Sequence, residues 1–459
     1  MRNASRPGCR TVRALAGKRK LAAASGHAAQ RCVAREPWAL DNPIPAVPPS
    51  VAHTMNVVLI SPGYPAEMPY FTRGLADVGA RVLGVGDQPR AGLDPELKKS
   101  LGDYLTVENL WDEDSTARAI REWTRGRTID RVECLWEPGM ILAAKVRAAL
   151  GVPGMSVEET LPFRDKVVMK DVLRKAGVRT SKHQRAKTAD EVREATERIG
   201  YPVIVKPVDG AGSADTYPVR DRGELESALA ALRSVPEVTV EEFIEGEEHT
   251  YDTITSDGDV LYENVAWYRP TPLVAKLNEW ISAQSTCLRD IERPEVKIGR
   301  ELGRSVLQAL GWRSGFTHME WFRTAKGEAI FGEIGGRPPG ARLVHLMNYS
   351  CDADLFRGWA EAVCHGRISQ DLSKKYNAGV VFKRAVGQGR IRAYEGLDRL
   401  MARYGEHVPV IDLAPIGAPR RDWKASAVGD GWIVVRHQDL DTCLALGDAF
   451  ASEFRIVAG

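Results

Sequence analysis

From Met55 onward the chain alternates short apolar runs with stretches of helical period. The apolar runs lie near residues 57–60, 80–85 and 131–135, and the helical stretches near 67–78, 114–125 and 139–150. Strands that alternate with helices in this way predict a parallel sheet with helices packed on it. The loop Ser61-Pro62-Gly63-Tyr64 holds one glycine and no G-x-G-x-x-G, so we assign no dinucleotide site to it. It still lies at the carboxyl end of a strand, where open α/β sheets bind ligands.

The pattern changes twice downstream. A helix within 161–181 carries Asp165-Lys166 in its first turn, and a strand–loop–strand over 201–218, a helix over 223–233 and a strand over 238–244 follow. Beyond about residue 374 we expect strands near 379–384 and 432–436 and a final helix over 439–450. A chain of this length exceeds one typical core, so several domains are expected.

A hairpin pattern over residues 316–334 carries two acids. The runs Phe316–Arg323 and Glu328–Ile334 flank Ala325-Lys326-Gly327. If Arg323 pairs with Glu328, Glu320 and Glu333 become diagonal neighbours on one largely apolar face, together with Phe316, His318, Phe322, Ala329 and Phe331. Two carboxylates there repel each other and lose hydration, and a divalent cation such as Mg²⁺ relieves both effects. The alternatives are an exposed hairpin with scattered acids, and a three-residue loop that puts the acids on opposite faces.

Two further features suit a phosphate or a carboxylate. Lys206 ends an apolar run and precedes the loop Asp209-Gly210-Ala211-Gly212-Ser213-Ala214-Asp215. Small residues let a backbone approach phosphates closely, and the lysine adds a point charge. Arg337 follows the hairpin in a Gly/Pro-rich turn, where a guanidinium can bind an anion in bidentate fashion. Taken alone, a glycine-rich loop after a lysine favours a plain turn over a phosphate site.

The run Val238–Glu248 is a strand that enters a charged turn. The backbone of residues 242–244 can pair with the edge of a purine, and Glu248 can accept hydrogen bonds from ribose hydroxyls. Taken alone, an acidic loop explains this stretch as well.

The order of these blocks resembles the ATP-grasp superfamily, over about residues 57–440 and most strongly between Lys166 and Arg337. The resemblance implies an α/β protein with the ATP-grasp fold. It implies a pre-ATP-grasp domain over 55–160, an ATP-grasp domain over 161–373 with a lid subdomain over about 182–245, and a small α/β C-terminal domain over 374–459.

The resemblance also implies roles for single residues. Lys166 and Lys206 would contact the nucleotide phosphates, and Gly210, Ala211, Gly212 and Ser213 would form the phosphate loop. The adenine hinge would comprise Glu241, Glu242, Phe243 and Ile244, with Glu248 on the ribose. Glu320 and Glu333 would bind Mg²⁺, with Mn²⁺ as the alternative ion. Arg337 would steady an acyl phosphate, so that Arg337 and Lys206 are the implied catalytic residues.

The implied reaction is that of an ATP-dependent carboxylate–amine ligase. ATP phosphorylates a carboxylate, an amine (less readily a thiol) attacks the acyl phosphate, and ADP and phosphate leave. Two alternatives stay open. One is a biotin-carboxylase-like enzyme that acts on a separate carrier, since the chain has no Met-Lys-Met biotin motif. The other is a non-catalytic nucleotide-binding regulatory module, a reading made more plausible by Gly335, which stands where the family usually has a metal-binding Asn.

Composition adds few constraints. The chain has 459 residues, 44% of them hydrophobic and 27% charged, with a net charge of +2, so no general attraction to nucleic acid or membrane is expected. No apolar run reaches the ~18 residues of a membrane span. The seven cysteines form no Cys-x-x-Cys, which is typical of reduced thiols in a cytoplasmic protein. We expect small-molecule carboxylate and amine substrates and leave a homodimer open.

Two further predictions concern the first 54 residues and the substrate site. Residues 1–54 are rich in Arg, Ala, Ser and Pro, which favours a disordered basic extension; a targeting peptide and an upstream start codon are the alternatives, and Met55 begins the first strand. Segments that could line the substrate site contain Trp267, Tyr268, Arg269, Lys276, Trp280, Arg342 and His345, although packing or surface roles are favoured for each.

Overall fold

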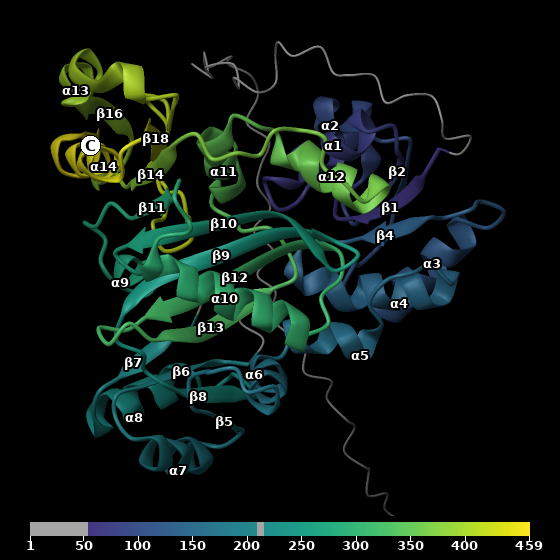
Figure 1. Ribbon diagram of the computed structural model, residues 1–459, viewed down its shortest axis with the longest axis horizontal. Coiled ribbons are helices and arrows are strands. Elements are labelled where there is room, and N and C mark those ends of the chain that lie inside the picture. Colours follow the sequence, from purple (N-terminus) through teal and green to yellow (C-terminus); the bar gives the residue numbers. More distant parts are fainter. Residues whose placement is uncertain (1–53, 209–214) are drawn as a thin grey trace, which may run out of the picture. The chain divides into compact units, whose positions relative to one another are not determined.

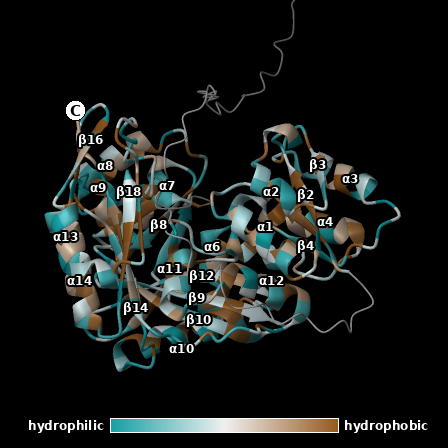
Figure 2. Cartoon of the chain, turned by 90° about the horizontal axis from the view of Figure 1, so that it is seen from above, coloured by the Kyte–Doolittle hydropathy of each residue, from teal (hydrophilic) through white to brown (hydrophobic). Residues whose placement is uncertain are grey.

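The computed structural model describes residues 54–208 and 215–459 (Figure 1). Its first part is a parallel sheet in the order β3-β2-β1-β4, which confirms the predicted βαβ pattern. Helix α3 buries Ala117 and Ile120 and turns charged residues outward, which Figure 2 shows as hydrophobic and hydrophilic stretches of one helix. The elements are β1 (Asn56–Ile60), α1 (Met68–Asp77), β2 (Arg81–Gly86), η2 (Arg90–Gly92), α2 (Pro95–Lys99), β3 (Asp103–Thr106), α3 (Glu113–Trp123), β4 (Arg131–Glu133), η3 (Glu137–Gly139) and α4 (Met140–Leu150).

A connecting segment leads to α6, the helix predicted from Asp165-Lys166. Asp165 caps α6, because its Oδ1 accepts hydrogen bonds from the backbone N–H groups of Val167 and Val168 at 3.0 Å each. Lys166 is therefore fixed in the first turn. The elements of this segment are α5 (Val157–Thr160), η4 (Leu161–Phe163) and α6 (Lys166–Lys175).

Residues 183–242 form a four-stranded sheet of their own, in the order β5-β8-β6-β7. Its hydrophobic cluster is separate from those of the other sheets and includes Val192, Val203, Val205, Leu225 and Val240. We call this part the lid. Its elements are β5 (His183–Ala186), α7 (Ala189–Ile199), β6 (Val203–Pro207), β7 (Tyr217–Val219), α8 (Arg222–Ala231) and β8 (Val238–Glu242).

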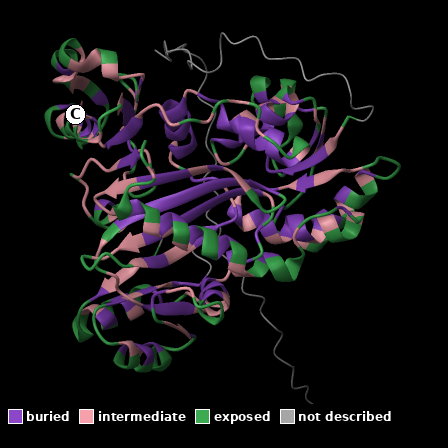
Figure 3. Cartoon of the chain, in the orientation of Figure 1, coloured by how far each residue is buried: buried purple, intermediate pink, exposed green. Residues whose placement is uncertain are grey.

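An eight-stranded sheet, the central sheet, runs in the order β13-β12-β9-β10-β11-β14-β18-β17. Strand β9 is almost entirely buried, whereas β10 is buried mainly in its middle (Figure 3). The strands are β9 (Glu247–Ser256), β10 (Asp259–Arg269), β11 (Gln284–Cys287), β12 (Gly315–Arg323), β13 (Ala329–Gly335), β14 (Asn377–Lys383), β17 (Val410–Leu413) and β18 (Gly431–His437). The predicted boundary at residue 374 therefore falls within one continuous sheet.

The remaining elements cover the central sheet or follow it. A small sheet in the order β15-β19-β16 and helix α14 pack together at the C-terminal end of the chain. These elements are α9 (Pro272–Leu277), α10 (Pro294–Ala309), α11 (Leu343–Cys351), α12 (Leu355–His365), β15 (Val386–Gly387), β16 (Ile391–Glu395), α13 (Leu397–Tyr404), η5 (Gly405–His407), α14 (Leu440–Glu453) and β19 (Arg455–Ala458). No helix in the described ranges is both long and apolar enough to cross a membrane.

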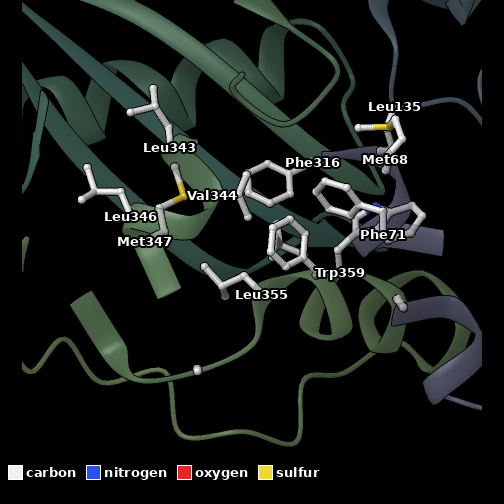
Figure 4. Close-up of a cluster of buried hydrophobic side chains, with 14 of the residues drawn as sticks. Met68, Phe71, Leu135, Phe316, Leu343, Val344, Leu346, Met347, Leu355 and Trp359 are labelled. Carbon is white, nitrogen blue, oxygen red and sulfur yellow. The ribbon is translucent and has the colours of Figure 1, made fainter. Parts of the chain in front are cut away.

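Aromatic residues join the N-terminal sheet to the central sheet (Figure 4). The Phe71 ring on α1 meets the Trp359 ring on α12 edge-on, with 5.3 Å between centroids, and lies 6.3 Å from the Phe316 ring on β12. All three side chains are fully buried. Edge-to-face contacts of this kind add to the stabilisation from burial, so the two sheets share one core at this junction.

Helix α10 approaches the central sheet closely because two of its residues are glycines. A Cβ on Gly299 would lie 2.0 Å from the Trp321 ring, and one on Gly303 would lie 2.1 Å from the Tyr251 ring. Both rings are fully buried and cannot move aside easily. Small residues at these positions therefore set the distance between the helix and the sheet that carries the candidate site.

We predict that Gly303→Ala destabilises the protein by about 1–3 kcal/mol, since the forced shift of Tyr251 exceeds the gain in helix propensity of about 1 kcal/mol. Urea unfolding measures the effect. Glu301→Ala, on an exposed position of the same helix, is the matched control and should be close to neutral. An unchanged midpoint for Gly303→Ala would contradict the close packing.

Candidate active site

A pocket of about 390 Å³ lies between the lid and the central sheet. Its walls combine one apolar and one charged group of residues. The apolar group is Ile204, Phe243, Ile244, Leu273, Val274, Leu277 and Phe322. The charged group contains the predicted residues Lys166, Lys206, Glu241, Glu242, Glu248, Glu320 and Glu333, and also Arg220 and Glu245, which were not predicted. The structure thus brings together residues that are up to 167 positions apart.

The two hairpin acids lie directly opposite each other. Glu320 on β12 pairs in register with Glu333 on β13, while Arg323 pairs with Ala329. The predicted pairing of Arg323 with Glu328, and the diagonal placement of the acids, are therefore wrong by one residue. Phe331 pairs with Trp321 and lies on the other face, again unlike the prediction. Both acids nevertheless share the face that lines the pocket.

A β-bulge brings the acids onto that face. The register shifts between Glu320 and Trp321, and Gly332 is the extra residue. In a regular ladder without the bulge, Glu320 would pair with Gly332 and Glu333 with Met319, and Glu333 would then point to the opposite side of the sheet because side chains alternate along a strand. A Cβ at position 332 would lie 2.8 Å from the Glu320 carbonyl oxygen, so glycine is required there.

Two lysines face Glu333 from outside the central sheet. The Nζ atoms of Lys166 on α6 and Lys206 on β6 each lie 3.7 Å from Glu333 Oε2. Burial opposes the ionisation of Glu333, but these two lysines outweigh it and hold the pKa of Glu333 below its usual value. The three charged groups thus form one cluster at the end of the pocket where positive charge gathers.

A third lysine, Lys170, escaped the sequence analysis. Its Nζ lies 2.5 Å from Glu241 Oε2 and donates to Ser181 Oγ at 2.8 Å, and only 1% of the side chain is exposed. The same Glu241 oxygen lies 3.1 Å from Lys206 Nζ. Lys170 follows Lys166 by four residues on a predicted helix, a spacing that puts both on one face. From this spacing Lys170 could have been predicted as a site residue.

The side chains of Lys170, Glu241 and Lys206 stabilise one another's charges. Burial opposes the ionisation of Glu241, yet Lys170 and Lys206 lower its pKa to about 2. For Lys206, burial is outweighed by Glu241 and Glu333, and its pKa lies above the usual value. For Lys170, burial is the larger effect and lowers the pKa to about 8. Glu241 therefore acts as the anion between two buried cations.

The hinge residues differ in what they offer to a ligand. The backbone N–H of Glu242 donates to the Lys182 carbonyl at 2.8 Å, and that of Phe243 donates to the Pro202 carbonyl at 3.2 Å. The Glu242 carboxylate lies 3.3 Å from Arg179, beside the pocket. Purine donors and acceptors would therefore meet the backbone near Ile244 more readily than at the two preceding amides.

Glu248 lies on β9, in register with Phe322 on β12. It is buried, and burial together with the charges of Glu320 and Glu333 raises its pKa well above the usual value. A hydroxyl partner would offset part of this unfavourable environment by donating a hydrogen bond to the carboxyl group.

His318 belongs to a buried polar chain on the same face of the sheet. Its Nδ1 lies 2.6 Å from Asp252 Oδ1, and its Nε2 lies 3.6 Å from Glu320 Oε1. The other Asp252 oxygen accepts from Thr250 Oγ1 at 2.7 Å and Asn264 Nδ2 at 3.1 Å. Burial disfavours the imidazolium, but Asp252 and Glu320 raise the pKa of His318 to about 9. The sequence placed His318 on this face, but gave no sign of Asp252.

Arg337 lies outside the pocket wall, at the turn after β13. Its Nε donates to Glu137 Oε2 at 2.9 Å, and its Nη1 donates to the Pro338 carbonyl at 3.1 Å. The other Glu137 oxygen accepts from Arg164 Nη1 at 2.8 Å. Glu137 belongs to η3, which follows β4 at the carboxyl edge of the N-terminal sheet. The sequence analysis had missed both Glu137 and Arg164.

The remaining predicted residues fall into three groups. Arg269 pairs with Asp448 at 3.0 Å, Trp280 is 81% exposed, and His345 is buried against Tyr70 and Phe356, so these serve surface or packing roles. The Arg342 guanidinium lies 5.9 Å from the Trp432 ring centroid, while Trp267 and Tyr268 belong to β10. Gly210, Ala211, Gly212 and Ser213 lie outside the described residues.

Comparisons with known proteins agree on one family. Residues 172–343 match the family model described as D-ala D-ala ligase C-terminus. A relative from Bacillus subtilis, an L-arginine-specific L-amino acid ligase, is 26% identical over 234 residues, which is 50% of this chain and 56% of the relative. The first relatives in this comparison are covered over about half to two thirds of their own length.

Solved structures show the same fold. An L-amino acid ligase from Bacillus licheniformis superposes with a TM-score of 0.72 at 20% identity, over 89% of this chain and all of that one. The N5-carboxyaminoimidazole synthetase from Staphylococcus aureus, solved with ADP, gives a TM-score of 0.64 at 16% identity, over 87% of this chain and 97% of that one. The chain has the fold of the ATP-grasp ligases, as the resemblance implied, and its residues 172–343 carry the family match.

We predict that Glu241→Gln destabilises the fold by about 3–5 kcal/mol at pH 7, because it leaves Lys170 and Lys206 buried without their anion. Since the pKa of Glu241 is lowered from 4.5 to about 2, its stabilising effect is complete above pH 4.5 and is lost as the pH falls toward 2.

Urea unfolding of wild type and variant at pH 7 and pH 3 tests this, and the difference between them should be smaller at pH 3. Glu242→Gln is the control on the next residue, where a partly exposed pair with Arg179 should contribute less than about 1 kcal/mol. Equal effects of the two substitutions would refute the central position of Glu241.

Proposed function

We propose that the protein is an ATP-dependent carboxylate–amine ligase that releases ADP and phosphate. One observation carries the proposal: a pocket lined by both apolar and charged residues, in which Lys166 and Lys206 each lie 3.7 Å from Glu333, the register partner of Glu320. Phosphoryl transfer needs positioning and charge neutralisation more than covalent catalysis by the protein, and this arrangement supplies both.

The apolar end of the pocket suits adenine. Ile204, Phe243, Leu273 and Phe322 line it, and the backbone near Ile244 provides polar edges. Glu248 is in register with Phe322 and near the charges of Glu320 and Glu333, where its carboxyl group would share hydrogen bonds with ribose hydroxyls. At the other end Lys166 and Lys206 provide the positive charge that the phosphates require. The volume is in the range of small-ligand pockets.

Glu320 and Glu333 would hold Mg²⁺. Their carboxylates are neighbours on adjacent strands and offer the hard oxygen ligands that this ion prefers. Among residues 54–208 and 215–459 no group of three His, Cys, Asp or Glu side chains is arranged to hold a metal ion, so the other ligands would be phosphate oxygens and water. The ion would neutralise charge between the transferring phosphates.

The substrate carboxylate would attack the γ-phosphorus of ATP, and ADP leaves. The amine then attacks the acyl carbon, phosphate leaves, and the amine proton passes to solvent or to phosphate. Arg337 would bind the acyl phosphate, since a guanidinium matches two of its oxygens. We further propose that the substrates are amino acids, because similar proteins from two Bacillus species are L-amino acid ligases.

The decisive experiment measures ADP release with amino acids supplied singly and in pairs. Release that requires a pair, with a dipeptide as product, supports the proposal. Release that requires bicarbonate and free biotin or a biotinylated carrier would replace it with the carboxylase reading. ATP binding without release under any of these conditions would replace it with a nucleotide-binding regulatory role.

We predict that Glu333→Gln lowers the turnover number by a factor of about 100 or more while ATP binding changes little. The amide keeps the shape of the side chain but removes a charged metal ligand, which matters most as charge develops during phosphoryl transfer. ADP production over a magnesium titration, with calorimetric ATP binding in parallel, measures the two effects.

Glu328→Gln is the matched control on the same hairpin. Its carboxylate is 51% exposed and lies 3.4 Å from Arg179, away from the pocket lining, so turnover should stay within about twofold of wild type. Normal turnover by Glu333→Gln at low magnesium would show that the paired acids do not form the metal site.

A further inference from the structure

A buried ion-pair cluster connects the N-terminal part of the chain to the turn that carries Arg337. Glu137 receives one hydrogen bond on each oxygen, from Arg164 Nη1 at 2.8 Å and from Arg337 Nε at 2.9 Å. The three side chains are 10%, 16% and 21% exposed, in the order Glu137, Arg164, Arg337. Arg164 immediately precedes Asp165, the residue that caps α6, so the cluster also adjoins the helix that presents Lys166.

The cluster fixes the guanidinium of Arg337 at two points. Nε is held by Glu137 and Nη1 by the Pro338 carbonyl. A planar group held at two donor atoms cannot rotate about its own axis, so the plane of the guanidinium is set. Among the described residues, the Pro338 carbonyl is the other hydrogen-bond partner of this guanidinium, so removal of Glu137 would leave one of its two attachment points.

Gly335 leaves the space that this arrangement occupies. A Cβ at position 335 would lie 3.3 Å from Arg337 Cγ, 3.5 Å from Arg337 Nε and 3.6 Å from Glu137 Oε2. The contact with Arg337 Cγ is tighter than usual, so a Cβ at position 335 would push the Arg337 side chain aside by a few tenths of an ångström, while the contacts with Nε and Glu137 Oε2 are ordinary packing distances. The glycine that stands in place of the family's usual Asn is thus part of the same local structure as Glu137.

We propose that Glu137 is a positioning residue, which holds the guanidinium of Arg337 in the orientation needed to bind the acyl phosphate, in space left open by Gly335. The proposal rests on the proposed ligase function for its catalytic consequence. It assigns the N-terminal sheet a part in catalysis, through a residue at the carboxyl edge of that sheet, where α/β proteins commonly place functional groups.

An effect of net charge and an effect of guanidinium orientation would change the turnover of Glu137→Gln in opposite directions, which makes the proposal testable. The cluster of two arginines and one carboxylate carries a net charge of +1. Replacing Glu137 with Gln raises this to +2, which by charge alone would strengthen anion binding and leave turnover intact or improved. The amide also replaces one acceptor oxygen by an N–H₂ group, which cannot accept from an arginine. If orientation matters, turnover must fall despite the added positive charge.

The experiment compares Glu137→Gln, Gly335→Ala and the double variant in the full-length protein. For each single variant we expect kcat to fall about tenfold or more while the KM for ATP stays within about twofold. The reason is that the Arg337 guanidinium would bind the acyl phosphate, which forms only after ATP has bound. The double variant should be little worse than the more severe single one, because both substitutions act through one guanidinium.

Glu361→Gln is the matched control. Glu361 accepts from Arg357 Nε at 3.0 Å and is equally buried, but it lies on α12 and does not line the pocket. This variant should lower the melting temperature and leave kcat within about twofold of wild type. Glu137→Asp is the conservative variant and should recover part of the lost kcat because it keeps the charge.

Each outcome decides the matter. A normal kcat for Glu137→Gln, or single effects that multiply fully in the double variant, overturns the proposal. If wild type releases no ADP with any substrate, the proposed function has failed, and thermal unfolding then decides on the ion pair. Non-additive losses of melting temperature would still support the contact of Glu137 and Arg337 across Gly335, whereas fully additive losses would overturn it.

Discussion

The structure depends on the mutual neutralisation of charges buried between the lid and the central sheet. Glu241 lies between Lys170 and Lys206, and Glu333 lies 3.7 Å from both Lys166 and Lys206. Isolated buried charges would be strongly unfavourable, whereas pairs with good geometry are tolerated. Because these residues come from α6, β6, β8 and β13, the cluster orders the lid, the capped helix and the hairpin around the same point. A polyphosphate would enter a site whose cations are already in place.

The backbone features that support this cluster are local. The Asp165 cap fixes the first turn of α6, and the Gly332 bulge turns Glu333 toward Glu320. Gly299 and Gly303 allow α10 to press against the opposite face of the same hairpin and its neighbour. The cap and the bulge each control where one charged side chain points, so a small change in register would separate the acids without unfolding the protein.

Much of the fold and of the site could be predicted from the sequence, for identifiable reasons. Hydrophobic period placed β1, β2, β4, α1, α3 and α4 of the N-terminal part but missed the short α2 and β3, and Asp-Lys before a helical stretch predicted α6. The order of the blocks brought Lys166, Lys206, Glu241, Glu320 and Glu333 together correctly in one pocket. The hairpin register was wrong because a bulge depends on pairing across strands, which no single-strand pattern reveals. Glu137 escaped prediction because it meets Arg337 from 200 positions away, in a loop with no motif.

The central claim is that a substrate carboxylate is phosphorylated between the paired lysines and acids. The most direct measurement uses a carboxylate substrate labelled with ¹⁸O, supplied with ATP, magnesium and the amine partner, and follows the label by mass spectrometry. The account predicts that label passes from the carboxylate to the released phosphate in step with ADP and amide formation. Amide formation with unlabelled phosphate would contradict it, since the carboxylate would then have been activated by some route other than an acyl phosphate.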